Sequence, residues 1–175
     1  ASVPLGRATL RVVDAAGKAP KTLATRLQRV GAPPGEVRGI LQGNQGMFPT
    51  VPAGDYWAMA AVTPAPGAAP EFAVVRTTVS GSDLQLTLTT ERGAALNGRL
   101  TAAGPAMPPL AGVQIRAESV EYELPNPAGS GAPAAAGPVI GADGTFAYKS
   151  LFGPRLFRLG GLPDGWALES VRIGD

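Results

Sequence analysis

A chain of 175 residues, 45% of them hydrophobic, is long enough to bury a core, which excludes wholesale disorder. The absence of cysteine and histidine excludes disulfides, thiol chemistry and histidine-based catalysis, and we expect neither a metal nor a cofactor. The scattered charges sum to +2 and do not form a basic surface for nucleic acid. No apolar run reaches the roughly 20 residues that span a bilayer, so no transmembrane segment is expected.

Glycine and proline indicate the fold class. The chain contains 24 Gly and 18 Pro. Proline lacks a backbone donor and glycine supplies the positive φ angles of tight turns, so long helices have little room. We therefore expect an all-β protein in which many short strands are joined by turns.

Alternating apolar and polar residues predict seven strands in the first half of the chain. In the last of them, Leu84, Leu86 and Leu88 alternate with polar residues, and we expect a hairpin with the preceding strand around residues 80–82. An earlier strand begins with an aromatic pair after a Pro/Gly corner at residues 52–54. The expected strands are residues 8–13, 23–30, 36–41, 47–48, 55–62, 72–79 and 84–90.

The second half predicts five strands and one irregularity. The alternation changes parity near Glu118, which predicts a bulge or bend after which Val120, Tyr122 and Leu124 continue the strand. Residues 125–138 are rich in Ala, Gly and Pro and predict a long mobile loop. The expected strands are residues 96–100, 113–117 with its continuation, 145–148, 156–159 and 166–173.

The two halves present their elements in the same order. Each has two strands separated by a Gly/Pro turn, then a Gly-x-Phe turn and strand, at Gly46–Phe48 and Gly144–Phe146. A corner of Gly and Pro and an aromatic strand follow in both halves. This repeat of roughly 80–90 residues predicts two tandem immunoglobulin-like or prealbumin-like β-sandwich modules, residues 1–91 and 92–175.

The repeated segments resemble carboxypeptidase regulatory-like domains, which belong to the same broad class as Cna-B-like and transthyretin-like domains. The resemblance implies a seven-strand sandwich, often repeated in secreted bacterial proteins, and brings no catalytic residues with it. The corner Gly153-Pro154 departs from the family, because it reverses the usual Pro-Gly order. The segments that carry the resemblance are Gly46–Phe48, Pro52–Tyr56, Leu96–Leu100, Leu110–Ile115, Asp143–Phe146 and Leu162–Trp166.

The second module has fewer expected strands than the first. Only residues 166–173 follow its aromatic strand, whereas two strands follow in the first module. A sandwich that lacks its final strand exposes unpaired backbone groups and part of its core. Three explanations stay open: a chain that continues beyond Asp175, a compact variant of the fold, or a strand supplied by another chain through β-augmentation. Ala1–Leu5 is a candidate for such a donor strand.

Glu118, Glu121 and Glu123 form the only acidic cluster. On an extended strand Glu121 and Glu123 share a face, where paired carboxylates would suit sugar hydrolysis. The favoured alternative is a solvated strand face. Asp143 looks like part of a calcium loop, but calcium takes about six to eight oxygens, so a β-turn aspartate is the preferred interpretation.

Aromatic residues offer the other candidate site. Tyr56 and Trp57 are consecutive and must face opposite sides of a strand, so one of them points away from its core. Trp57 is therefore the best candidate for stacking on carbohydrate, with core packing as the favoured alternative for the aromatic residues as a group. The predicted ligand-binding residues are Trp57, Tyr122, Glu121 and Glu123.

These observations predict a non-catalytic protein. We expect a structural or adhesive module of an extracellular or cell-surface assembly, exported with a signal peptide since removed, that contacts protein neighbours or copies of itself through strand edges. The alternative is an accessory domain that binds polysaccharide for a secreted enzyme or a transporter. An independent enzyme is disfavoured because every standard catalytic set lacks a member.

Overall fold

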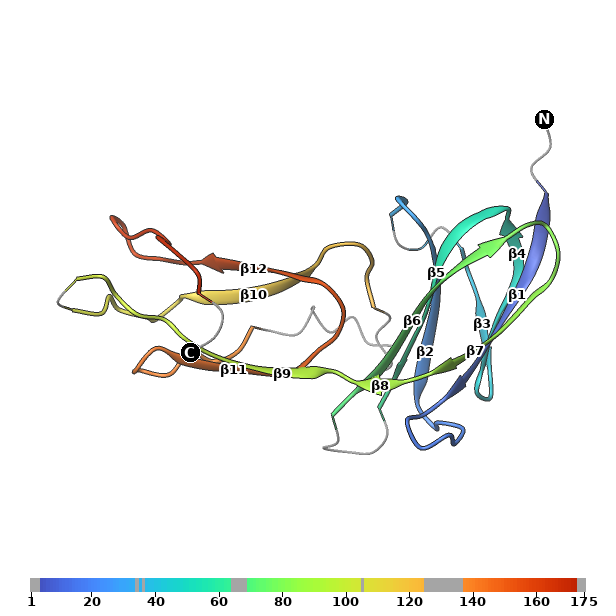
Figure 1. The fold of residues 1–175 in the computed structure, drawn as a ribbon, viewed down its shortest axis with the longest axis horizontal. Helices are drawn as coiled ribbons and strands as arrows, with labels where there is room; N and C mark the ends of the chain where they lie inside the picture. The colour runs from blue at the N-terminus through green and yellow to red at the C-terminus, as the bar shows by residue number, and fades with distance from the viewer. Residues whose placement is uncertain are drawn as a thin grey trace. The chain divides into compact units, whose positions relative to one another are not determined.

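The computed structural model describes residues 4–33, 35, 37–63, 69–104, 106–124 and 137–172, and within them the fold is all-β, as expected (Figure 1). The chain divides into two compact units. Unit 1 comprises Ala1–Ala94 with Glu121–Pro133, and unit 2 comprises Ala95–Val120 with Ala134–Asp175. The described residues include no helix long and apolar enough to cross a membrane.

Unit 1 is a sandwich of two four-stranded sheets that enclose one apolar core. The strand order is β3-β4-β1-β7 in the first sheet and β2-β5-β6-β8 in the second. The strands are β1 (Leu5–Val13), β2 (Leu23–Arg29), β3 (Ile40–Gln42), β4 (Gln45–Pro52), β5 (Gly54–Val62), β6 (Glu71–Val79), β7 (Leu84–Thr89) and β8 (Glu91–Arg92).

Alternation along the strands builds this core. In β1, Leu10 and Val12 are fully buried, and the residues that alternate with them are more exposed. In β7, Leu88 is fully buried, and Leu84 and Leu86 pack against the core cluster. The alternation predicted for both strands is confirmed.

The predicted hairpin between β6 and β7 is wrong. β6 pairs antiparallel with β5 in the second sheet, whereas β7 pairs parallel with β1 in the first sheet. The chain crosses from one sheet to the other at residues 80–83. Alternation shows that a strand has a buried face. It does not show whether the next strand pairs with it in the same sheet or packs against it from the facing sheet.

The strand predicted at residues 36–41 is shorter and begins later. β3 covers only Ile40–Gln42, and all three of its residues are exposed. Val37, in contrast, is buried in the core without being part of a strand. Glu36 lies outside the described residues. Burial of Val37 thus accounts for an apolar position that the sequence pattern assigned to a strand.

A buried carboxylate links three segments of unit 1. Glu71, at the start of β6, is 4% exposed. Its Oε2 accepts hydrogen bonds from Thr90 Oγ1 at 2.8 Å and from the Ala15 N–H at 3.0 Å. Burial of a carboxylate without partners would be strongly destabilising. These two donors therefore join β6 to the end of β7 and to the turn after β1.

Unit 2 contains two two-stranded sheets, β10-β12 and β11-β9. The pairing repeats part of that in unit 1. The pair β9 and β11 corresponds to β1 and β4. The pair β10 and β12 corresponds to β2 and β5. The strands are β9 (Ala94–Arg99), β10 (Gln114–Ser119), β11 (Thr145–Leu151) and β12 (Arg155–Gly160).

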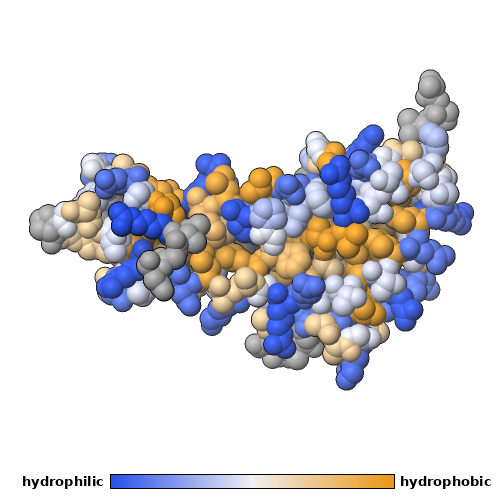
Figure 2. All heavy atoms as spheres, in the orientation of Figure 1, coloured by the Kyte–Doolittle hydropathy of each residue, from blue (hydrophilic) through white to orange (hydrophobic). Residues whose placement is uncertain are grey.

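The core of unit 2 is small. Among the hydrophobic side chains in the described part of this unit, Val113 and Ile115 alone are buried. Leu156, Phe157 and Trp166 remain 47%, 42% and 41% exposed. Figure 2 shows apolar side chains at the surface of this unit. Unit 2 therefore leaves much of its apolar surface in contact with solvent.

The predicted continuation of β10 is wrong. The strand ends at Ser119 and the chain bends at residues 120–121, so the predicted irregularity near Glu118 is a bend, and no strand continues through Leu124. One of the three residues behind the apparent alternation, Tyr122, packs in unit 1 instead.

The strand predicted at residues 166–173 is also absent from the described part, since residues 166–172 pair with no sheet. Trp166 and Leu168 would share one face of an extended segment, but Val171 has the opposite parity, and an apolar segment does not by itself provide a neighbouring edge. Ile173 lies outside the described residues, as do residues 125–136 of the predicted loop.

Candidate functional site

Strand β5 carries an aromatic side chain on each face of the second sheet of unit 1. Tyr56 is fully buried in the core, and its hydroxyl donates a hydrogen bond to Pro52 O at 2.7 Å. Trp57 is half-buried and lies outside the core cluster, on the opposite side of the sheet. The prediction that the two residues face opposite sides is confirmed. We call this side of the sheet, around Trp57, the outer face.

Residues 121–124 cover part of the outer face. They belong to unit 1, although they follow β10 in the chain. Tyr122 is 7% exposed, and its ring centroid lies 5.2 Å from that of Trp57 with the planes tilted by 53°. Arg76 Cζ lies 5.9 Å from the Trp57 ring centroid, within cation–π range. The indole therefore contacts an aromatic ring and a cation of its own unit.

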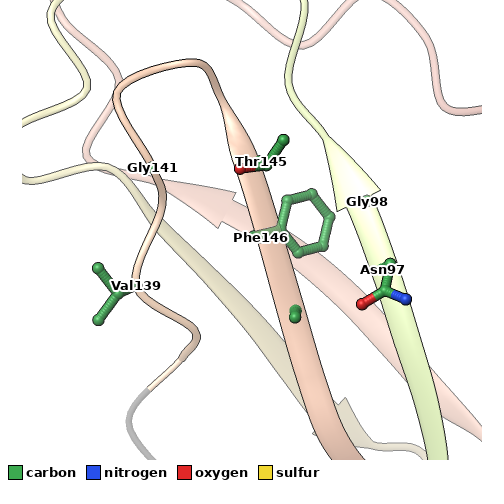
Figure 3. A pocket seen from close by; sticks show the side chains of 7 residues that line it. Asn97, Gly98, Val139, Gly141, Thr145 and Phe146 are labelled. Carbon is green, nitrogen blue, oxygen red and sulfur yellow. The ribbon is translucent and has the colours of Figure 1, made fainter.

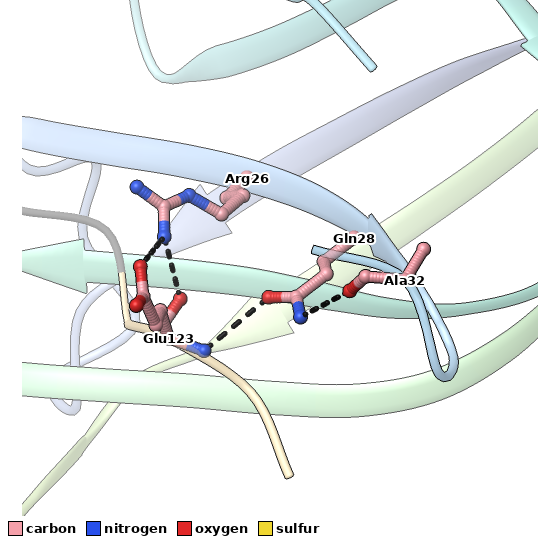
Figure 4. A network of polar contacts seen from close by, with 4 residues as sticks. All are labelled: Arg26, Gln28, Ala32 and Glu123. Atoms are coloured by element: carbon pink, nitrogen blue, oxygen red, sulfur yellow. Dashed lines mark hydrogen bonds and ion pairs between the residues drawn. The ribbon is translucent and has the colours of Figure 1, made fainter. Parts of the chain in front are cut away.

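Polar contacts hold the same segment beside β2 (Figure 4). Arg26 Nη1 donates to the backbone oxygen of Glu123 at 3.0 Å and lies 3.5 Å from Glu123 Oε2. Gln28 is 6% exposed; its Oε1 accepts from the Glu123 N–H at 3.3 Å, and its Nε2 donates to Ala32 O at 3.1 Å. Both ends of this buried amide are paired, as a buried polar group requires.

A second polar group borders the outer face. Thr78 Oγ1 donates to Asp55 Oδ1 at 2.7 Å, and Arg76 Nη2 donates to Asp55 Oδ2 at 3.4 Å. The Thr78 hydrogen bond, followed by Arg76, holds the pKa of Asp55 below its ordinary value of 3.8. Arg76 thus lies between the Asp55 carboxylate and the Trp57 ring.

The structure brings three of the four predicted ligand-binding residues together. Trp57, Tyr122 and Glu123 meet at the outer face. Glu121 is exposed and makes no hydrogen bond or ion pair with any described residue.

Arg26, Gln28 and Arg76 also belong to this group, although they were not predicted. In the sheet, Gln28 and Arg76 stand opposite Trp57 on the two neighbouring strands. The only sequence signal was the alternation in β2 and β6, and it becomes informative only when the register of those strands with β5 is known.

The geometry is better suited to anchoring a segment than to catalysis. Glycoside hydrolysis needs a carboxyl group that its environment keeps protonated, together with a second carboxylate. Glu121 and Glu123 are both exposed, and Glu123 Oε2 is engaged by Arg26. The contacts of Tyr122 and of the Glu123 backbone instead fix residues 121–124 on the sheet.

Replacing Tyr122 with alanine is expected to release this segment. The change removes a nearly buried ring and its contact with Trp57, at a cost of about 2 kcal/mol. Trp57 then becomes more exposed, so its fluorescence emission moves to longer wavelength. The measurement uses a Trp166→Phe background, because the chain contains two tryptophans and the other lies in unit 2.

Two variants serve as controls for this prediction. Tyr122→Phe keeps the ring and should leave the emission nearly unchanged. Glu121→Ala changes an exposed residue of the same segment that has no described partner, and should also have no effect. Equal emission spectra for Tyr122→Ala and the parent protein would contradict the anchoring role.

Asp143, whose sequence context resembles part of a calcium loop, lies in a turn. Its Oδ1 accepts hydrogen bonds from Thr145 Oγ1 at 2.7 Å and from the Thr145 N–H at 3.1 Å. The described residues contain no group of three or more His, Cys, Asp or Glu side chains that could hold a metal ion. The carboxylate thus caps the turn that leads into β11.

Asp143 is expected to make unit 2 sensitive to acid. The Thr145 hydrogen bonds hold the pKa of Asp143 below 3.8, so its stabilising contribution is present above the unfolded-state pKa. It is lost as the pH falls from the unfolded-state pKa through the lower folded-state pKa. The stability difference between the parent and Asp143→Asn should therefore shrink over this range. Amide exchange of β11 measures it, and a difference independent of pH would contradict this account.

Two open hollows lie in unit 2. Neither is lined by a charged residue, so neither offers a charged group for catalysis or for an ionic ligand. The first, of about 510 Å³, is shown in Figure 3 with the Phe146 ring beside Gly98; its lining is Asn97, Gly98, Val139, Gly141, Thr145, Phe146 and Ala147. The second, of about 610 Å³, is lined by residues 107–111 and 140–142.

Comparisons of the chain with protein-family models, with curated proteins and with solved structures find no match.

Proposed function

We propose that the chain is a non-catalytic structural or adhesive module of an extracellular or cell-surface assembly. It contacts its protein neighbours through the edges of its strands. One observation carries the proposal: each strand of unit 2 has a single described neighbour, and apolar side chains of this unit remain exposed beside those edges. Unpaired edges next to apolar surface favour the addition of another strand.

Association of the purified protein tests this proposal. We expect sedimentation velocity to show mass that increases with concentration, and electron microscopy to show ordered end-to-end contacts. A protein that stays monomeric at every concentration and binds no protein surface would overturn the proposal. Turnover of a substrate by the purified chain would overturn its non-catalytic part.

Carbohydrate binding is the second candidate function. The half-buried Trp57, with Arg76 and Asp55 beside it, provides an aromatic surface next to charged groups, which is the chemistry that sugars use. It is the weaker candidate because Tyr122 and Arg76 already contact the indole. Binding to immobilised polysaccharide that is lost in Trp57→Ala and retained in Glu121→Ala would establish it in place of the structural function.

A further inference from the structure

Two strands of unit 2 lack the second neighbour that their counterparts in unit 1 have. In unit 1, β5 lies between β2 and β6, and β1 lies between β4 and β7. Their counterparts in unit 2, β12 and β9, each have one described neighbour, β10 and β11. The position that β6 occupies beside β5 has no described strand beside β12. We call this side of β12 the open edge.

An aromatic residue of the inner face is exposed on the strand that bears the open edge. Phe157 of β12 stands opposite Ala117 of β10 and contacts Tyr148 of β11, with ring centroids 5.7 Å apart. Tyr148 belongs to the other sheet, so Phe157 points into the space between the sheets. It is nevertheless 42% exposed. A strand beside β12 would cover this ring.

The same unit contains an exposed apolar segment that joins none of the described sheets. Residues 166–172 pair with no strand, and Trp166, Leu168 and Val171 are 41%, 53% and 74% exposed. Trp166 and Leu168 have the same parity, so an extended conformation places both on one face. The chain thus holds an unpaired edge and an unpaired apolar segment.

We propose, building on the structural function above, that residues 166–172 of one copy pair with the open edge of β12 in a second copy. The strands run antiparallel, as β6 runs beside β5. Leu168 stands opposite Phe157 and Trp166 opposite Leu159. This register places both donor side chains on the inner face, where they cover the exposed aromatic ring.

Charge complementarity supports this register. Arg158 of β12 points to the outside of the sheet, and its Nε donates to Glu118 Oε2 of β10 at 2.7 Å. Glu118 stands opposite Leu156. In the proposed register Glu169 of the donor also stands opposite Leu156, on the other side of β12. Arg158 then has a carboxylate in the diagonal position on each flanking strand. Opposite charges in such cross-strand positions attract each other.

The path of the chain after β12 favours a donor from a second copy. Gly160 is the last residue paired with β10, at Gln114. A Cβ added to Gly161 would collide with Gly112 O, so the backbone continues beside the segment that precedes β10. The chain therefore leaves β12 on its paired side, away from the open edge. Residues 166–172 of a second copy can reach the open edge without first crossing from the paired side of β12.

Cysteine pairs test the contact directly, because the chain has no cysteine of its own. One preparation carries Phe157→Cys and the other Leu168→Cys, and the two are mixed under mild oxidation. We expect a disulfide-linked dimer of the two variants, since opposite residues of antiparallel strands lie close enough to be bridged. Leu159→Cys mixed with Trp166→Cys tests the same register at a second pair, in case Phe157→Cys perturbs unit 2.

Parity supplies the matched control. Phe157→Cys mixed with Ala167→Cys should lose the dimer, because Ala167 faces the other side of the donor strand. A chain that carries both Phe157→Cys and Leu168→Cys tests whether the donor strand comes from the same copy. A disulfide that forms only within this chain, and never between two copies, would overturn the proposal that a second copy supplies the strand. Absence of both bridges in a protein that still associates would overturn this pairing and leave the proposed function standing. Failure of the parent protein to associate at all would overturn both.

Discussion

Tyr56→Ala is expected to destabilise unit 1 by about 3–5 kcal/mol, the largest effect expected of any single side chain in its core. Tyr56 is fully buried near the start of β5, and its hydroxyl donates to Pro52 O. The substitution removes an aromatic ring from a closely packed interior and leaves the carbonyl of the corner before β5 without this donor. The cavity cannot close by simple relaxation, because Tyr56 belongs to a closely packed core cluster to which both sheets contribute.

Urea unfolding followed by Trp57 fluorescence in a Trp166→Phe background measures this loss for unit 1 alone. Tyr56→Phe is the matched control, since it keeps the ring and removes only the hydrogen bond, at a cost of about 1 kcal/mol. A Tyr56→Ala protein whose unfolding midpoint is close to that of Tyr56→Phe would show that the ring contributes little to the core.

Gly144→Ala is expected to unfold the turn before β11 and to destabilise unit 2 by about 3 kcal/mol or more. Gly144 has a φ of 83°, which a residue with a side chain adopts at a cost of about 1–2 kcal/mol. A Cβ at this position would also collide with Leu100 O. The Leu100 N–H donates to Gly144 O at 2.9 Å, so displacement of the turn breaks a link between β9 and β11.

Gly165→Ala separates the two causes. Gly165 has a φ of 82°, almost that of Gly144, but no atom lies within 4 Å of a Cβ built there. It should therefore show only the cost of the positive φ. Amide exchange of β9 and β11 measures the effect, with β1 and β5 of unit 1 as internal references. Equal losses of protection in the two variants would show that the collision at Leu100 contributes nothing.

The sequence was sufficient for features that depend on local chemistry. The turns at glycine, the burial of Leu10 and Leu88, and the opposite faces of Tyr56 and Trp57 all follow from periodicity and backbone preference. The glycine and proline content predicted an all-β fold, and the described residues are all-β. Each of these properties is determined within one strand or one turn, and a single sequence records it directly.

Pairing was not predictable in the same way, because it depends on residues far apart in the chain. Leu84–Thr89 has the pattern of a hairpin strand, yet its partner is β1. Tyr122 continues the alternation of β10, yet its ring packs on Trp57 in unit 1. For this reason only part of the candidate site could be predicted from the sequence. Its aromatic residues were predicted, but the Arg26 and Gln28 side chains that hold Glu123 were not. The division into tandem modules and the family resemblance remain predictions.

The parallel pair of β1 and β7 has a consequence for how unit 1 folds. β1 cannot acquire both of its neighbours until residues 84–89 are available, and the outer face is not covered until residues 121–124 arrive. Contacts between such distant segments make folding slow, because the loop must close before any pairing energy is gained. A polypeptide emerging from the ribosome or a translocation pore would therefore hold β1 unpaired on one edge, and would need protection from aggregation until part of the following unit had emerged.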